Sequence, residues 1–176
     1  MSCSPTNDSP VAAWLEEHRG IFVKVARAYA RGETEVADLQ QEMLYQLWLS
    51  LRGFAGEAKP STWVYRVCLN TALTWRRGTE RRERRIEPGA QVDAIAAAGE
   101  SPAESAEQRE WLEKLYEALR ALPETERALV LLMLDGLAYR EIGEVTGMTE
   151  NHVGVALTRA RRRLAEKMKG VIDELG

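Results

Sequence analysis

Apolar residues recur three and four positions apart along most of the chain, which predicts amphipathic helices and gives no confident strand. In the first half the pattern predicts three helices: one over 12–30, a second that Thr34 caps after a stop at Gly32, and a third that opens at Pro60. Their core faces are expected to hold Leu15, Phe22, Val25 and Tyr29; Leu39, Met43, Leu47 and Leu51; and Val64, Val67, Thr71 and Trp75. The opposite side of the third helix carries Tyr65, Arg66, Leu69 and Asn70.

The second half of the chain predicts four more helices, which would close into a small bundle. The first is marked by Trp111, Leu112, Leu115 and Leu119. The next has Pro123 in its first turn, with acidic residues near the positive end of the helix dipole, and it ends at Asp135-Gly136. Its core side is expected to hold Val130, Met133 and Leu134.

Residues 138–164 predict a helix, a glycine turn and a second helix that ends in an arginine-rich run. Gly147 suits the left-handed residue that ends a helix, and Thr149 can cap the next one. The inward positions are Ile142, Val145, Val153, Leu157, Ala160 and Leu164, and the outward ones are Asn151, His152, Gly154, Thr158 and Arg159. This pattern indicates a helix-turn-helix that places its second helix in the major groove of DNA. A helical hairpin with a solvated basic end is the alternative for this segment taken alone.

A change of composition at 86–107 separates the two groups of helices, because this stretch is rich in Ala, Gly, Pro, Ser and Glu and lacks aromatic residues. We therefore predict a flexible tail at 1–10, a first domain at 11–85, an acidic linker at 86–107 and a second domain at 108–176. The expected fold class is all-α: two small helical domains joined by a flexible acidic linker, the second containing the helix-turn-helix.

The net charge of −3 conceals two basic patches. Residues 10–85 carry 13 Lys and Arg against 9 Asp and Glu, whereas residues 86–110 carry one Arg against six acids. Six arginines lie within 76–85, and six Lys and Arg lie within 159–169. Because a polyanion responds to the local field, the acidic total does not exclude binding to nucleic acid.

Several functional classes find little support in the sequence. No apolar run approaches the roughly 20 residues of a membrane helix, and the start of the chain lacks the features of a secretion signal. Two cysteines, Cys3 and Cys68, cannot form a disulfide framework, so we expect a cytoplasmic protein with Cys68 as a small core residue. Asp38 and Glu42 lie one turn apart, but a dinuclear metal site would also need Glu-x-x-His pairs, which the chain lacks. We expect no metal, no cofactor and no enzymatic activity.

Aromatic and basic residues alternate around the third helix, where Phe54, Trp63, Tyr65 and Trp75 precede the arginine cluster. Melted DNA requires this combination of flat surfaces for unstacked bases and cations for the backbone. Trp75 is expected to belong to the core, whereas Phe54, in a loop between glycines, is less easily explained by packing.

Two long segments carry a resemblance to a known family: DLQQEMLYQLWLSLRGFAGEAKPSTWVYRVCLNTALTWRR and LRALPETERALVLLMLDGLAYREIGEVTGMTENHVGVALTRARRRL. With them the chain resembles bacterial RNA polymerase sigma factors of the extracytoplasmic-function group. Together with the helix before them, these segments cover nearly everything outside the tail and the linker. Two long patterns in the right order are far more specific than a helix-turn-helix alone.

The resemblance implies three sets of contact residues. A surface that docks on the clamp helices of the polymerase would comprise Asp38, Leu39, Gln41, Glu42, Leu44 and Trp48. Contacts with the minus-ten element, including a pocket for a flipped base at Phe54, would come from Phe54, Trp63, Arg66, Asn70, Arg76 and Arg77. Contacts with the minus-thirty-five element would come from Thr149, Asn151, His152, Thr158, Arg159, Arg161 and Arg162. The implied partners are core RNA polymerase, through its clamp helices and flap, promoter DNA and an anti-sigma factor.

The chain departs from the family pattern in the recognition helix. The family often has Thr-Val-x-Ser-Arg there, whereas this chain has His152-Val153-Gly154-Val155-Ala156, which moves phosphate binding toward Arg159, Arg161 and Arg162. Two other hypotheses stay open at this stage. One is a stand-alone helix-turn-helix regulator that binds duplex DNA without polymerase, and the other is a helical interaction protein or a small metal-carboxylate enzyme.

Overall fold

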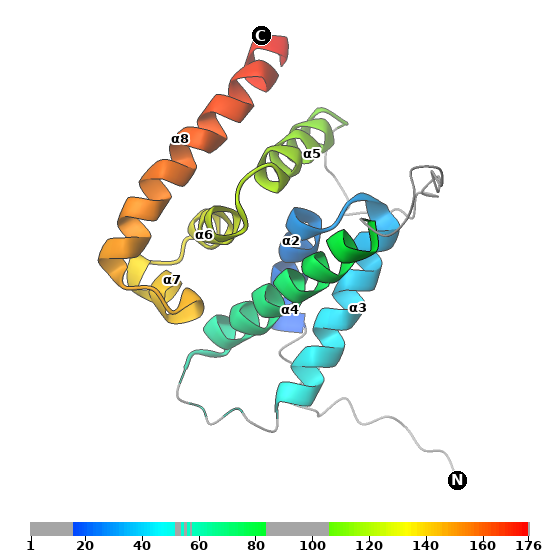
Figure 1. Cartoon of the computed structure of the whole chain (residues 1–176), viewed down its shortest axis with the longest axis vertical. Coiled ribbons are helices and arrows are strands. Elements are labelled where there is room, and N and C mark those ends of the chain that lie inside the picture. Colours follow the sequence, from blue (N-terminus) through cyan, green and yellow to red (C-terminus); the bar gives the residue numbers. More distant parts are fainter. Residues whose placement is uncertain (1–15, 52–53, 55, 57, 84–105, 176) are drawn as a thin grey trace.

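The computed structural model describes residues 16–51, 54, 56, 58–83 and 106–175, and it describes side chains as far as 81 and 169 in the last two ranges. Within these ranges all regular structure is helical. The helices are α2 (Arg19–Tyr29), α3 (Gly32–Ser50), α4 (Pro60–Glu83), α5 (Ala106–Arg120), α6 (Glu124–Leu134), α7 (Tyr139–Thr146) and α8 (Glu150–Leu175) (Figure 1). The predicted tail and most of the predicted linker lie outside the described residues, as does Leu15.

Helices α2, α3 and α4 pack against one another and form the first half of the structure. Their shared core contains the fully buried side chains of Val25, Leu39, Met43, Leu47 and Val64. Cys68 is also buried in this core, as the sequence predicted, and burial raises the pKa of its thiol to about 12. The periodic apolar positions of the three predicted helices therefore do meet in one core.

Helix α3 begins earlier than predicted, at Gly32, and Thr34 does not cap it. Gly32 has a φ of 70°, a left-handed value that glycine tolerates, and the chain turns into the helix there. The carboxylate of Glu35 accepts a hydrogen bond from the backbone N–H of Arg31 at 2.6 Å. This carboxylate supplies the acceptor at the helix start that we had expected from Thr34.

Helix α4 is buried on more sides than its sequence suggests. It packs on α2 and α3, and its other side faces α7 of the second half. Tyr65 and Leu69, which we had placed on the side away from the core, are therefore only 3% and 5% exposed. Trp75 packs against the core as expected.

Helices α5 to α8 form the second half, in which α8 packs on α5, α6 and α7. Val130 is fully buried and Met133 packs against the core, but Leu134 is 53% exposed. Leu134 is the last residue of α6, where the chain leaves the bundle in the turn at Gly136, so its predicted core position is wrong. Pro123 is the cap residue before α6 rather than a residue of its first turn.

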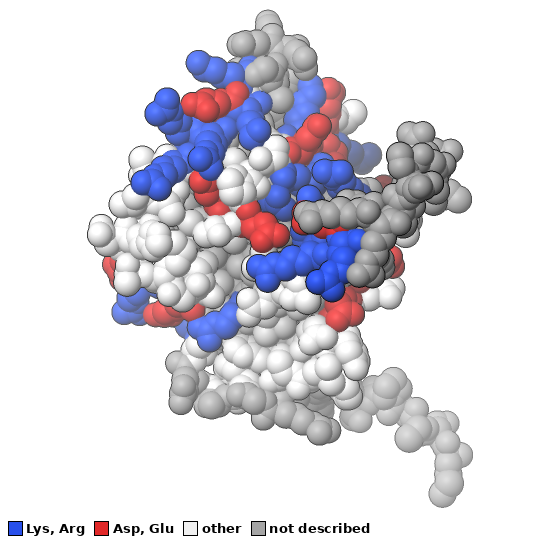
Figure 2. Space-filling view, viewed as in Figure 1, with Lys and Arg blue, Asp and Glu red and all other residues white. Residues whose placement is uncertain are grey.

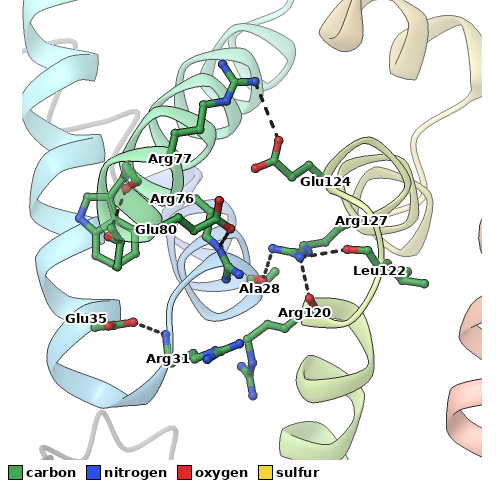
Figure 3. A network of polar contacts seen from close by, with 12 residues as sticks. Ala28, Arg31, Glu35, Arg76, Arg77, Glu80, Arg120, Leu122, Glu124 and Arg127 are labelled. Atoms are coloured by element: carbon green, nitrogen blue, oxygen red, sulfur yellow. Dashed lines mark hydrogen bonds and ion pairs between the residues drawn. The ribbon is translucent and has the colours of Figure 1, made fainter. Parts of the chain in front are cut away.

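The two halves are in direct contact, with α2 beside α5 and α6 and with α4 beside α7 (Figure 1). Arg127 of α6 lies at the centre of this interface and is 3% exposed (Figure 3). Its guanidinium donates to the carbonyls at the end of α5 and beyond, namely Leu119 at 3.0 Å, Arg120 at 2.6 Å and Leu122 at 3.0 Å. It also reaches the carbonyl of Ala28 in α2 at 3.4 Å.

Two further hydrogen bonds cross the same interface. The Tyr29 hydroxyl donates to the carbonyl of Glu124 at 3.2 Å, and Arg120 donates to the carbonyl of Arg27 at 2.9 Å. The Arg127 guanidinium also lies 4.8 Å from the centre of the Tyr29 ring, within the range of a cation–π contact. Burial raises the pKa of the Tyr29 phenol, so the hydroxyl stays protonated and available as a donor. The interface thus joins helix ends through backbone carbonyls.

Candidate nucleic-acid interface

The helix-turn-helix has the geometry that the sequence predicted. Gly147 ends α7 with a φ of 76°, and the Thr149 hydroxyl accepts the backbone N–H of His152 at 3.4 Å at the start of α8. The inner positions Val153, Leu157 and Ala160 are fully buried. The outward side chains are exposed, namely Thr149, Asn151, His152, Thr158 and Arg159. The first turns of α8 therefore present polar groups to the surroundings.

Two glycines of this motif, Gly143 and Gly154, differ in the space that surrounds them. A Cβ at Gly143 would lie 2.5 Å from the backbone oxygen of Met148, so the turn between the two helices has no room for a side chain there. A Cβ at Gly154 would lie 3.5 Å from the ring of Tyr139, which is an ordinary contact. Gly143 is thus required because α7 approaches the turn so closely, whereas the space at Gly154 would accept a Cβ.

The arginines that follow on α8 differ in their partners. Arg161 contacts the Met133 sulfur at 2.9 Å and the Tyr139 hydroxyl at 3.5 Å. Arg162 pairs with Glu166 at 3.1 Å within the helix. Arg159 is exposed and has neither a hydrogen bond nor an ion pair to any described residue. On the face shown in Figure 2, lysines and arginines gather over the later turns of α8, and the area around its first turns is largely uncharged.

The aromatic side chains before and within α4 also come together. The rings of Phe54 and Trp63 lie 5.1 Å apart between centres, tilted by 55°, and both side chains are half-buried. Asn70 is exposed two turns further along α4. Arg76 donates to Glu80 at 2.9 Å within the same helix. This arrangement offers a partly open aromatic surface with an exposed amide further along the same helix, whereas the Arg76 side chain is only 19% exposed and is paired within the helix.

Part of α4 is covered by the second half of the protein. Arg66 donates to the carbonyl of Glu144 near the end of α7. Arg77 lies 3.9 Å from a carboxylate oxygen of Glu124, as Figure 3 shows. The residues predicted to contact the minus-ten element therefore include two that contact the second half instead.

Lys59, just before α4, adds an ion pair to this contact. Its ammonium lies 2.6 Å from the carboxylate of Glu141 in α7. The hydrogen bond from Lys59 and a second one from the backbone N–H of Ala138 lower the pKa of this carboxyl from its ordinary value. Glu141 thus both closes the first turn of α7 and links it to the start of α4.

Helix α3 carries an exposed apolar stripe that no described part of the chain covers. Leu44, Tyr45, Trp48 and Leu49 are 38%, 54%, 57% and 45% exposed, and Asp38 and Gln41 extend the same surface. Tyr45 and Leu49 were not singled out from the sequence, although each follows an expected contact residue directly in the chain. We define the exposed stripe of α3 as Asp38, Gln41, Leu44, Tyr45, Trp48 and Leu49.

Two residues predicted to dock on the clamp helices, Leu39 and Glu42, are not fully exposed. Leu39 is fully buried among the helices of the first half, so its side chain has no surface to offer a partner and we remove it from that set. Glu42 is half-buried at the edge of the stripe and accepts a hydrogen bond from Gln46 at 2.9 Å.

Two family models match the chain, one in each group of helices. Residues 14–82 match the family model described as sigma-70 region 2, and residues 112–164 match the model described as sigma-70, region 4. The first match holds α2, α3 and nearly all of α4, and the second holds the helix-turn-helix. The chain belongs to the sigma-70 family of RNA polymerase sigma factors.

Curated relatives carry names of the extracytoplasmic-function (ECF) group. This sigma factor is 29% identical over 149 residues to the ECF RNA polymerase sigma-E factor of Escherichia coli strain K12, with 78% of this chain and 76% of that protein covered. It is 30% identical over 169 residues to the ECF RNA polymerase sigma factor SigG of Mycobacterium tuberculosis, with 80% and 44% covered. The resemblance stated from the sequence is thereby confirmed.

Solved structures share the fold. The sigma factor RpoE of Bartonella quintana, solved with the anti-sigma factor NepR, has a TM-score of 0.68 at 19% identity, with 88% of this chain and 94% of that chain covered. CnrH, solved with the cytosolic domain of CnrY, has a TM-score of 0.65 at 19% identity, with 91% and 88% covered. Among the described residues of the present chain, no helix is long and apolar enough to cross a membrane, and no three His, Cys, Asp or Glu side chains gather in a way that could hold a metal ion.

Proposed function

We propose that this sigma factor binds core RNA polymerase through α3, contacts the upstream promoter element with α8, and stabilises the melted minus-ten element with α4 and the loop before it. The main support is that one chain joins an exposed helix-turn-helix to a region 2 domain whose α3 displays an uncovered apolar stripe. The factor itself catalyses no reaction in this proposal, and it acts in the cytoplasm, where the polymerase is.

The exposed stripe of α3 is proposed as the surface for the clamp helices of the polymerase. Trp48 and Tyr45 are large side chains that leave more than half of their surface in water, which is costly unless a partner covers them. Aromatic residues of this kind provide much of the binding energy at protein interfaces. Asp38 and Gln41 would supply polar contacts at the rim of the same surface.

The aromatic pair of Phe54 and Trp63 is proposed as the surface that receives an unstacked base of the non-template strand. Stacking on a protein aromatic ring contributes about 1–3 kcal/mol per base, which offsets much of the few kcal/mol needed to unstack it. Asn70, exposed on the same helix, can both donate to and accept from a base edge. Arg76 and Arg77 would bind the backbone.

The arrangement with the two halves in contact is proposed as the free state of the factor. Promoter DNA would compete with Glu144 and Glu124 for Arg66 and Arg77, so we propose that loading on DNA separates the halves. An anti-sigma factor, as solved with RpoE of Bartonella quintana, would control this step in the present chain. The second half would then pack on the polymerase flap.

The test is transcription in vitro from fragmented genomic DNA with bacterial core polymerase, with and without the protein. We expect new transcripts that share upstream elements. Trp48→Ala should weaken binding to core by about 30-fold, the effect of a hot-spot residue worth about 2 kcal/mol. Trp111→Ala is the matched control, because Trp111 is also exposed, at 44%, but lies on α5. Sequence-specific duplex binding without any binding to core would favour the stand-alone regulator instead.

A further inference from the structure

Val155 is an exposed apolar residue on the outward side of α8. It is 47% exposed, whereas Val153 and Leu157, two positions to either side, are fully buried. The residues one helical turn away on its own side are Asn151 and Arg159, and both are exposed. Val155 therefore contributes nothing evident to the core of the second half and lies among groups that suit a polar ligand.

The position of Val155 in the helix-turn-helix indicates a role for its exposed side chain. It lies in the second turn of a helix that follows a helix-turn-helix turn, and the first turns of such a helix contact base edges in the major groove. Arg159, one turn later, has no partner among the described residues, so its guanidinium is available for a phosphate. The apolar side chain thus lies between an amide and a guanidinium on one helix face, an arrangement that suits the edge of a DNA duplex.

The chemistry of the major groove identifies the group that an aliphatic side chain can contact. Thymine alone carries a methyl group there, whereas the other base edges present hydrogen-bond donors and acceptors. Asn151 matches adenine, whose N6 and N7 an amide can bind with two hydrogen bonds. Four helical residues rise about 6 Å, which corresponds to about two steps of 3.4 Å along the DNA. The two side chains would therefore contact bases about two pairs apart.

We propose that Val155 recognises the methyl group of a thymine in the upstream promoter element, about two base pairs from an adenine bound by Asn151. This inference rests on the proposed function, because it requires α8 to lie in the major groove of that element. It adds a residue that determines specificity to the set predicted from the sequence, which contained polar and basic side chains only.

The experiment begins with the holoenzyme, formed from the full chain and bacterial core polymerase, and selects bound sequences from duplexes randomised upstream of a fixed start region. Each thymine of the selected upstream element is then replaced by deoxyuridine, which removes only the methyl group. We expect one replacement to weaken binding about fourfold, the equivalent of about 0.8 kcal/mol for one buried methyl group. Val155→Ala should bind the thymine and deoxyuridine duplexes equally well.

Leu134→Ala is the matched control, since Leu134 is an aliphatic residue of similar exposure, 53%, at the end of α6. It should retain the full difference between thymine and deoxyuridine. Insensitivity to every deoxyuridine, or an equal loss in wild type and Val155→Ala, would overturn the inference while leaving the proposed function intact. Failure to enrich any upstream element would refute the proposed function and this inference together.

Discussion

Arg127→Met is the change that tests the buried polar contacts of the second half most severely. The substitution removes a guanidinium that is 3% exposed and donates to the carbonyls of Leu119, Arg120, Leu122 and Ala28. Methionine fills a similar length but donates no hydrogen bond, so these carbonyls lose a partner within the protein. Burial lowers the pKa of the guanidinium, but an arginine stays charged at neutral pH, so the bonds removed are charge-assisted.

The magnitude follows from these contacts. A hydrogen bond to a charged group contributes about 1.5–3 kcal/mol, but bonds made by one group do not add fully. We therefore expect the free energy of unfolding to fall by about 3–5 kcal/mol, which is less than the full sum of these bonds. For a chain of this length that corresponds to a decrease in Tm of about 6–20 °C.

Urea denaturation followed by far-UV circular dichroism measures this loss. Arg127→Lys keeps the charge but replaces the planar guanidinium with a single ammonium group, which cannot reach all of these carbonyls. The free energy of unfolding should therefore fall by less than in Arg127→Met. Tyr29→Phe removes only the hydrogen bond to Glu124, 3.2 Å long, and should cost about 1 kcal/mol. A loss below about 1 kcal/mol for Arg127→Met would refute the conclusion that its hydrogen bonds stabilise the fold.

Three other changes have definite expected outcomes. Gly143→Ala should destabilise the protein by about 1–3 kcal/mol through collision with the Met148 carbonyl, whereas Gly154→Ala should stabilise it by about 1 kcal/mol, both measured by urea denaturation. Cys68, in a chain carrying Cys3→Ser, should react with thiol reagents only after unfolding, because burial raises the pKa of its thiol to about 12; fast labelling of folded protein would contradict this. Phe54→Ala should impair promoter opening, detected by permanganate reactivity of unpaired thymines, more than binding to core; equal losses would argue against base capture.

The sequence predicted the features that depend on residues close together in the chain. Helical spacing located the fully buried Leu39, Met43 and Leu47, and the preference of glycine for positive φ located the turn at Gly147. The hydroxyl of Thr149 accepts the hydrogen bond expected of a cap residue. Each of these features depends on a few neighbouring residues, which a single sequence displays directly.

The features that the sequence did not predict depend on contact between distant segments. Tyr65 and Leu69 occupy the less apolar side of α4, and they are buried because α4 packs on α2, α3 and α7. Arg127 lies between two glutamates and an alanine in the order Glu124-Thr-Glu126-Arg127-Ala128, a pattern typical of an exposed helix face. Its burial follows from the meeting of the ends of α2 and α5, which no local pattern shows.

The same contacts indicate how readily the two halves can separate. Arg127 keeps its hydrogen bonds to Leu119, Arg120 and Leu122 when the halves part, because all three belong to the second half. Separation breaks its 3.4 Å contact with Ala28 and exposed ion pairs such as Lys59–Glu141. It also breaks three hydrogen bonds to backbone carbonyls: Tyr29 to Glu124, Arg120 to Arg27, and Arg66 to Glu144.

Exposed ion pairs contribute about 0–1 kcal/mol each, a neutral hydrogen bond about 1 kcal/mol and a hydrogen bond from a charged group about 1.5–3 kcal/mol. Bonds that share residues do not add fully, so the polar contacts between the halves contribute several kcal/mol together. Binding of nanomolar affinity corresponds to about 12 kcal/mol. In the proposed function, binding to polymerase would have to offset these polar contacts and the apolar packing that the two halves share. The second half would keep its own stabilising arginine throughout, because three of the four hydrogen bonds of Arg127 lie within that half.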